Sequence, residues 1–212
     1  MPKPLHQEAI AHLNGADPMM RQMIQQVGPC TLRPKRDRFR MLAESIISQQ
    51  ISTGAARSIK ARLDELLQPA GVTPESLAEF TPEQLRVAGV SPQKAKYLLD
   101  LADKVNSGTV QLGQIGRYSD DKVTEQLTCV KGIGKWTAKM FLMFALGRPD
   151  IFPHDDLGIR QAIRMGYGLD ELPDEQRSLE IAAAWRPHAT VASWYCWRWL
   201  DQQKAKQMAE KR

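Results

Sequence analysis

The sequence contains little cysteine, and its few cysteines lie far apart. Cys30, Cys129 and Cys196 are the three cysteines in a chain of 212 residues. An odd number at such wide spacing supplies neither a disulfide framework nor the paired cysteines of a zinc site. Reduced thiols, as in proteins of the cell interior, are the simpler interpretation. A small domain held together by disulfides is therefore excluded.

Long apolar runs are also missing. The first four residues lead into polar sequence, without the apolar core of a signal peptide. The longest strongly apolar run, residues 140–146, is far shorter than the roughly 20 residues that a membrane-spanning helix needs. We expect a soluble intracellular protein with no membrane partner, in the cytoplasm or nucleoid of a bacterium or in the nucleus of a eukaryote.

Low-complexity segments, internal repeats and extreme charge are absent as well. With 42% hydrophobic and 25% charged residues, the composition is that of an ordinary globular protein. The length allows one well-buried domain or two small lobes. Lys and Arg outnumber Asp and Glu by 29 to 24. This mild positive excess favours an anionic partner such as nucleic acid, although many basic proteins bind no polyanion.

What the sequence does contain is helical periodicity. Apolar residues recur every three or four positions, and no long stretch alternates with period two. Thr-Pro-Glu at Thr73 and Thr81, and Ser-Pro at Ser91, are strong helix-start signals. The fold class is predicted to be all-α. Helices are expected over 39–47, 53–67, 91–105, 120–127, 134–146, 156–165, 175–184 and 188–201, with short ones after Thr73 and Thr81.

A short Gly-Arg-Pro-Asp segment at residues 147–150 is the best candidate for a boundary. We predict a central helical lobe over 36–147. Residues 1–35 and 148–212 form the second lobe, with residues 1–30 as a returning helix and 204–212 as a solvated helix end. The two lobes together are expected to make one continuous catalytic unit.

Two glycines, Gly132 and Gly134, stand between two predicted helices in residues 127–138. Glycine permits a positive φ and a close backbone approach. The unpaired N–H groups that open the second helix can then bind a phosphate oxygen, and Lys131 and Lys135 add positive charge beside them. The alternative is an ordinary tight turn between helices, with glycine at the helix stop.

Two adjacent acids, Asp155 and Asp156, follow about 20 residues downstream, after Pro153 and before an amphipathic helix. Either acid could simply be the N-cap of that helix, a role that contributes about 1 kcal/mol.

The hairpin followed by Pro-x-Asp-Asp resembles the helix–hairpin–helix (HhH-GPD) DNA glycosylase superfamily. Three blocks agree with this resemblance, at residues 45–52, 132–138 and 185–197, and it covers about residues 36–200. The chain is most similar to the alkylation-repair branch of bacterial 3-methyladenine DNA glycosylase II, in a short form without that enzyme's N-terminal β domain.

The resemblance implies two helical lobes with a cleft between them. It also implies a monofunctional glycosylase of base excision repair, a monomer that flips alkylated purines, N3- or N7-methylated, out of double-stranded DNA and hydrolyses the N-glycosidic bond. In this branch the second acid is catalytic, which implies that Asp156 stabilises the oxocarbenium-like sugar and that Asp155 is the cap or a helper. Because the acids are adjacent, a shift of one residue stays open.

The resemblance also assigns a base pocket to Trp136, Trp197 and Met140. Trp136 stands where lyase-competent relatives carry a lysine, and an indole cannot form a Schiff base, so no AP-lyase activity is expected. Its face suits a cationic alkylpurine. Met140 replaces an aromatic residue, which predicts a looser or differently selective pocket. Most of the remaining tryptophans are better explained by core or surface packing: Trp185, Trp194 and Trp199.

Further residues follow from the same comparison. Gln50 matches the wedge that fills the hole left by the flipped base, and Gln49 stands beside it. The alternative is that these two glutamines simply form a polar helix end. DNA contacts are expected from Gly132, Gly134, Lys131, Lys135, Thr137, Gln49 and Gln50. The backbone carbonyls of Thr128, Val130 and Ile133 match those that hold a structural Na⁺ or K⁺. No cofactor is required, and three scattered cysteines exclude an iron–sulfur cluster.

Three rival functions remain at this stage. The chain could be an HhH module that binds damaged DNA without chemistry, or a monofunctional glycosylase for an oxidised or mismatched base. It could also be a helical scaffold with no nucleic-acid role. The sequence does not rank individual alkylated bases as substrates.

Overall fold

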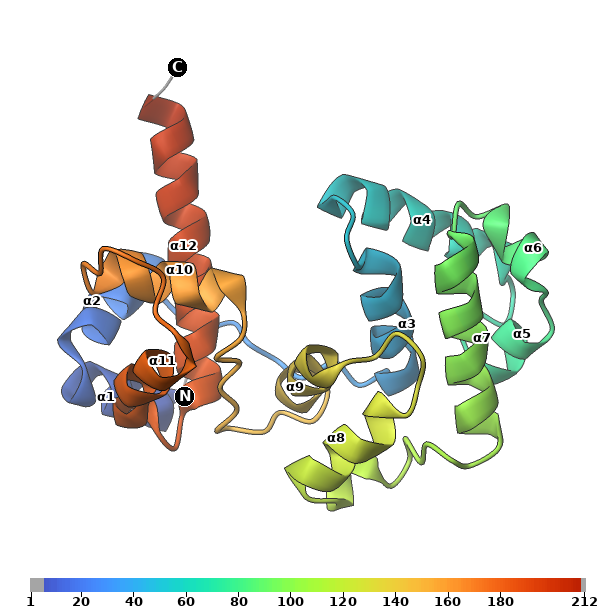
Figure 1. Cartoon of the computed structure of the whole chain (residues 1–212), viewed down its shortest axis with the longest axis horizontal. Coiled ribbons are helices and arrows are strands. Elements are labelled where there is room, and N and C mark those ends of the chain that lie inside the picture. The colour runs from blue at the N-terminus through green and yellow to red at the C-terminus, as the bar shows by residue number, and fades with distance from the viewer. Residues whose placement is uncertain (1–5, 211–212) are drawn as a thin grey trace, which may run out of the picture. The chain divides into compact units, whose positions relative to one another are not determined.

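The computed structural model of the chain describes residues 6–210, and every regular element within them is a helix (Figure 1). The all-α prediction is confirmed. The chain divides into two compact units: unit 1 comprises Met1–Pro34 and Gly147–Arg212, and unit 2 comprises Lys35–Leu146. These bounds differ by one residue from those that the sequence predicted. Among the described residues, no helix is long and apolar enough to cross a membrane.

Unit 2 is a bundle of helices around α3, which packs against α4, α7 and α9, while α8 packs against α9. Figure 1 shows α7 beside the short helices α5 and α6, and both contact it. Its elements are α3 (Arg38–Ser48), α4 (Thr53–Leu66), α5 (Pro74–Ala78), α6 (Pro82–Arg86), α7 (Pro92–Asn106), the 3₁₀ turn η1 (Ile115–Arg117), α8 (Asp120–Thr128) and α9 (Lys135–Phe144).

The helix starts of unit 2 follow local sequence signals. Thr73 and Thr81 each cap a helix whose first residue is proline, as predicted. The acceptor that completes each capping box is the residue three positions on, Ser76 or Gln84, rather than the early glutamate. α7 ends just before Gly108, which has a φ of +78°. A left-handed residue of this kind stops a helix, and glycine adopts it without steric cost.

Unit 1 is assembled on the long helix α12, against which α2 and α10 pack. Its elements are α1 (Gln7–Ala16), α2 (Pro18–Val27), α10 (Leu157–Gly166), α11 (Glu175–Ala182), the 3₁₀ turn η2 (Ala183–Trp185) and α12 (Ala189–Glu210). The predicted single helix over residues 1–30 is wrong: residues 1–5 lie outside the described residues, and Asp17 separates two helices. The predicted solvated helix end is exposed helix as far as Glu210.

Asp17 is a buried acid that ties these helices together. One carboxylate oxygen accepts the N–H groups of Met19 and Met20, which caps α2. The other accepts the Tyr167 hydroxyl and, at 2.8 Å, the indole N–H of Trp185. Burial, with Asp17 beside it, raises the pKa of the Tyr167 hydroxyl. Because Tyr167 directly follows α10, this network holds the far end of the helix whose start carries Asp156.

The structure agrees with two smaller expectations. Trp185, Trp194 and Trp199 are buried, as their assignment to packing requires. Cys30, Cys129 and Cys196 are free thiols, of which only Cys129 is exposed.

Candidate functional site

The predicted site residues fall into two groups. Asp155, Asp156 and Trp197 belong to unit 1, whereas the hairpin, Trp136, Met140 and the two glutamines belong to unit 2. Each group is built by its own unit.

Asp156 is held at the start of α10 by two N–H donors. It is the N-cap residue, and its Oδ1 accepts the backbone N–H of Ile159 at 2.9 Å. The same oxygen accepts the indole Nε1–H of Trp197 at 2.8 Å. Trp197 comes from the middle of α12, which packs against α10. The structure therefore brings together two residues that lie 41 positions apart and that the sequence assigned to different roles.

Gly158 leaves room for the contact between Asp156 and Trp197. A Cβ atom at Gly158 would lie 3.1 Å from Oδ1 of Asp156 and 3.1 Å from Cδ1 of Trp197, closer than ordinary van der Waals contact. Sequence reasoning missed this residue. The available signal was a glycine in the first turn of a helix, where it costs stability relative to alanine and so calls for a packing reason.

The prediction that Asp155 might be the cap is wrong. Its side chain is exposed, and the capping oxygen belongs to Asp156. The two interpretations of the acid pair, a helix N-cap and a catalytic acid, therefore apply to the same residue, because Asp156 is both the cap and the candidate catalytic acid. No observation yet tests a helper role for Asp155.

The chemistry open to Asp156 follows from how it is held. Two directional hydrogen bonds fix one oxygen, and both donors are neutral groups. A carboxylate that is fixed before the reaction stabilises a positive charge that develops nearby, with no cost of reorganisation during the reaction. The arrangement suits stabilisation of a cation.

In unit 2, the two hairpin glycines have different reasons to be glycine. Gly132 has a φ of +82°, and a Cβ there would lie 2.2 Å from the Tyr97 ring. Gly134 has a φ of −98°, so it does not use the positive φ that glycine permits. Nothing lies within 4 Å of a Cβ at Gly134, which is the N-cap of α9 and offers no side-chain cap. The N-cap residue of α9 therefore supplies no side-chain acceptor for the opening N–H groups of the helix.

The two hairpin lysines also differ. The backbone N–H of Lys131 donates to Asp100 Oδ2 at 2.8 Å, so this N–H is already used inside the protein. Its ammonium group lies 3.7 Å from Asp100, and Lys104 donates to the same carboxylate at 2.8 Å. Burial opposes the charge of Asp100, but the hydrogen bonds from Lys104 and Lys131 outweigh it and lower its pKa. The Lys135 side chain is exposed.

The pocket residues on α9 divide by exposure. Trp136, the second residue of the helix, is 42% exposed, which is high for an indole. Met140, one turn later, and Thr137 are both 5% exposed. Trp136 is thus available to a ligand, whereas Met140 and Thr137 are largely covered. Their assigned contacts with base and DNA remain predictions.

The two glutamines form a short loop after α3. Gln50 is exposed with a φ of +55°, a left-handed conformation that costs a non-glycine residue about 1 kcal/mol. Such strain is often found at functional sites. Gln49 points inward, and its Nε2 donates to the carbonyl of Gly132 at 2.8 Å. We name residues 49–51 the wedge loop. A hollow of about 440 Å³ is lined by this loop, by the start of α7 and by Gly132.

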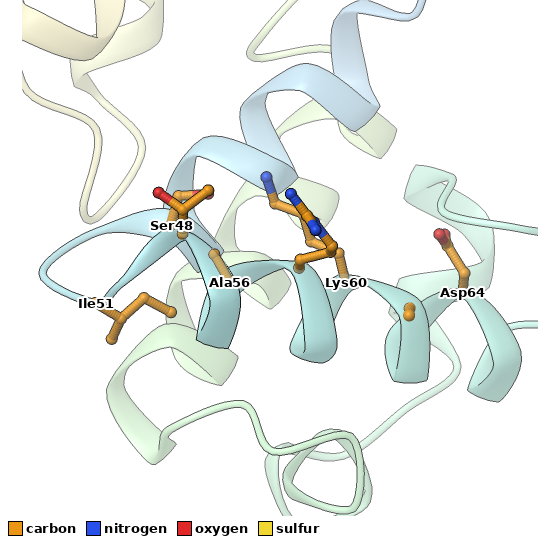
Figure 2. Close-up of a pocket in the computed structure, with 8 residues that line it drawn as sticks. Ser48, Ile51, Ala56, Lys60 and Asp64 are labelled. Atoms are coloured by element: carbon orange, nitrogen blue, oxygen red, sulfur yellow. The ribbon is translucent and has the colours of Figure 1, made fainter. Parts of the chain in front are cut away.

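A second hollow of about 460 Å³ runs along α3 and α4. Figure 2 shows Ser48 and Ile51 at one end of it and Asp64 at the other, with Lys60 between them. Its charges are mostly paired within the protein, since Lys60 lies 3.8 Å from Glu44 and Asp64 accepts a hydrogen bond from Arg40. Ile51 lines both hollows, so the wedge loop borders each of them.

The residues expected to hold a monovalent cation sit in the turn between α8 and α9. Thr128 is the last residue of α8, where carbonyls lack an intrahelical partner. The Val130 carbonyl accepts the N–H of Ile133 at 3.1 Å and keeps a second lone pair. Neutral carbonyl oxygens suit Na⁺ or K⁺, so this donor set fits the ion that the resemblance implies.

Comparison with known proteins now gives this arrangement a family. The family described as "HhH-GPD superfamily base excision DNA repair protein" matches residues 43–187, well over half of the chain. The chain belongs to this superfamily, and the resemblance inferred from its motifs is confirmed.

Individual relatives agree. DNA-3-methyladenine glycosylase 1 of Schizosaccharomyces pombe is 32% identical over 90% of this chain and 86% of its own length. The solved structure of a 3-methyladenine DNA glycosylase from that yeast, in complex with abasic DNA, matches with a TM-score of 0.80 at 32% identity, covering 90% of this chain and 95% of the other. A DNA-3-methyladenine glycosidase from Bacillus halodurans matches with a TM-score of 0.82 at 34% identity, covering 93% and 91%.

Proposed function

We propose that the chain is a DNA glycosylase of base excision repair that removes alkylated purines. It hydrolyses the N-glycosidic bond between the damaged base and its sugar. The observation that carries this proposal is the carboxylate of Asp156, fixed by the N–H groups of Ile159 and Trp197 at the start of α10. Membership of the superfamily and the names of the relatives support the reaction and the class of base.

The substrate must first leave the helix. A base inside a duplex is out of reach, so enzymes of this kind rotate the nucleotide out of the stack. The strained, exposed Gln50 of the wedge loop fills the hole. The exposed face of Trp136 stacks on the extruded purine, and a positively charged alkylpurine adds a cation–π attraction.

The bond then breaks with Asp156 as the stabilising charge. As the bond lengthens, positive charge builds on the deoxyribose, and the fixed carboxylate lowers the energy of that state or orients the attacking water. N3- and N7-alkylated purines already carry positive charge and leave readily. Since Trp136 cannot form a Schiff base, the DNA strand stays intact and no lyase step follows.

The hairpin grips the DNA backbone. The opening N–H groups of α9 face a phosphate across the open space at Gly134, and Lys135 adds its charge. The backbone carbonyls of Thr128, Val130 and Ile133 would hold a Na⁺ or K⁺, which would add positive charge to the hairpin. The protein acts as a monomer on double-stranded DNA, and it therefore works in the compartment that holds the DNA.

The test compares two adjacent, isosteric substitutions. Methylated DNA is incubated with the wild type, Asp156→Asn or Asp155→Asn, and free bases are separated by chromatography. Asp156→Asn should lower base release by at least about 100-fold while DNA affinity persists, because the charge is lost and the geometry kept. Asp155→Asn should stay close to the wild type. Normal release by Asp156→Asn would contradict the mechanism.

A panel of defined lesions tests the substrate class. Duplexes carrying 3-methyladenine, 7-methylguanine, hypoxanthine, an etheno adduct or 8-oxoguanine are compared under the same conditions. Release should be confined to alkylated purines and close analogues. Release of 8-oxoguanine alone would instead favour the oxidised-base alternative, and binding without any release would favour a non-catalytic module.

A further inference from the structure

Two segments of unit 2, the wedge loop and the hairpin, contact one face of α7. The wedge loop follows α3, the hairpin (residues 128–134) joins α8 to α9, and α7 touches both. This contact rests on side chains spaced three residues apart on α7: Lys94, Tyr97 and Asp100. Residues three or four apart lie on the same face of a helix.

Lys94 holds the wedge loop. Its ammonium group donates to the carbonyls of Ile47 at 2.8 Å and Gln49 at 2.7 Å. Those carbonyls belong to the C-terminal end of α3, where intrahelical partners run out and where positive charge is favoured. These contacts are partly buried, and burial lowers the pKa of Lys94.

Tyr97 and Asp100 hold the hairpin. The Tyr97 ring lies against Gly132 so closely that no Cβ fits between them. One turn on, Asp100 accepts the backbone N–H of Lys131 at 2.8 Å and is steadied by Lys104. The loop and the hairpin also touch directly, through Gln49 and the carbonyl of Gly132. Gln49, Lys94, Tyr97 and Gly132 line the hollow of about 440 Å³.

We propose that this face of α7, formed by Lys94, Tyr97 and Asp100, is a bridge that sets the spacing between the wedge loop and the phosphate-gripping hairpin. The inference rests on the proposed function, because the spacing matters only if both segments contact the same DNA. The three residues are positioning residues. They keep the wedge in register with the backbone that the hairpin holds, so that insertion of Gln50 and capture of the phosphate occur together.

Asp100 offers a test that separates position from charge. Asp100→Asn keeps an oxygen acceptor for the N–H of Lys131 but removes the negative charge, whereas Asp100→Ala removes both. Affinity is measured for a duplex with a tetrahydrofuran abasic analogue. Loss of a negative charge near DNA tightens binding by itself. The bridge predicts that Asp100→Ala nevertheless binds about tenfold more weakly than Asp100→Asn, because the hairpin is no longer held.

Lys94 offers the second test, with a control on the same helix. Lys94→Met keeps the apolar stem and removes the two bonds to the wedge loop. Lys96→Met removes an equal charge from an exposed position two residues away. Both should change DNA affinity equally, but Lys94→Met should also lower the single-turnover rate of base release at saturating enzyme by about tenfold. A purely stabilising role would move the melting temperature without moving this rate.

The outcomes separate the two proposals. If the wild type releases alkylated bases but Asp100→Ala binds as tightly as Asp100→Asn, the bridge is wrong and the glycosylase stands. Equal single-turnover rates for Lys94→Met and Lys96→Met also overturn it. If the wild type releases no base and does not bind the duplex, both proposals fall together. Should Asp100→Ala not fold, the lysine pair decides alone.

Discussion

Each unit contains an aspartate, an aromatic ring and a glycine packed together, and the two sets do different work. In unit 1, Asp156 accepts the indole N–H of Trp197, and Gly158 leaves room for that contact. In unit 2, Asp100 lies one turn beyond Tyr97, whose ring covers Gly132. Both aspartates accept a backbone N–H, from Ile159 in one case and from Lys131 in the other.

The difference lies in the remaining partners. Asp100 is paired with the ammonium groups of Lys104 and Lys131, so its charge is balanced inside the protein. The two donors on Oδ1 of Asp156 are neutral, and they fix the oxygen without supplying a positive charge of their own. The same residue type thus anchors the hairpin to α7 in unit 2, whereas in unit 1 a backbone amide and an indole fix the direction of one of its oxygens.

The largest effect is expected from Gly132→Ala, which disturbs the packing of Gly132 against Tyr97 in unit 2. The new Cβ would overlap the Tyr97 ring, and the backbone has a positive φ, so the free energy of unfolding should fall by about 2–4 kcal/mol. Urea denaturation measures this change. In Gly134→Ala the Cβ enters open space, so stability should change by less than about 1 kcal/mol. The DNA affinity of Gly134→Ala should nevertheless drop, because the new Cβ blocks the approach of the phosphate. Equal losses of stability in Gly132→Ala and Gly134→Ala would contradict this account.

Trp197→Phe should have the next largest effect. It keeps an aromatic ring but removes the N–H that fixes Asp156, so base release should fall about tenfold at nearly unchanged stability. The matched change in unit 2 is Tyr97→Phe. It keeps the ring over Gly132 and loses only the exposed hydroxyl that accepts a bond from Gln93, so activity should stay near the wild type. The single-turnover rate of base release is measured for both variants. Equal rates for Trp197→Phe and Tyr97→Phe would contradict the role given to the indole N–H.

Gly158→Ala should separate stability from activity. Alanine is the better helix former by roughly 1 kcal/mol, which offsets the tight contact with Asp156 and Trp197. The melting temperature should therefore hold or rise slightly. Base release should fall about threefold to tenfold, because the carboxylate is displaced by a few tenths of an ångström. An unchanged rate would show that the fit between these three residues does not matter for catalysis.

The smallest expected effect is the pH dependence of the Asp100 pairing. Its pKa is lowered in the folded protein, so its stabilising contribution is complete above the unfolded pKa of about 3.9 and is lost as the pH falls through the lower folded value. The wild type should exceed Asp100→Asn in unfolding free energy by about 1 kcal/mol or less near pH 6. Urea titrations should show that the gap closes below about pH 4. If the difference in unfolding free energy between the wild type and Asp100→Asn persisted at low pH, the ionised Asp100 carboxylate would not be its cause.

The sequence by itself determined most of the helices and the family, and it named the candidate site residues. Periodicity and capping residues are local signals, and they located α3–α10 to within a few residues. The hairpin and the Asp-Asp pair are short motifs, so their recognition needed no knowledge of packing. Even the break at residue 147 could be found, because glycine and proline interrupt a helix for local reasons.

Only the tertiary structure decided which residues hold one another. No spacing rule connects Trp197 to Asp156 or Asp100 to Lys131, since these pairs lie 41 and 31 positions apart and meet through the packing of whole helices. The same packing decided that Asp156 rather than Asp155 is the cap, that the Tyr97 ring lies against Gly132 and not against Gly134, and that Met140 is covered while Trp136 is exposed. Local sequence sets the backbone, but side-chain partners depend on distances between helices, and those follow from the core that the whole chain buries.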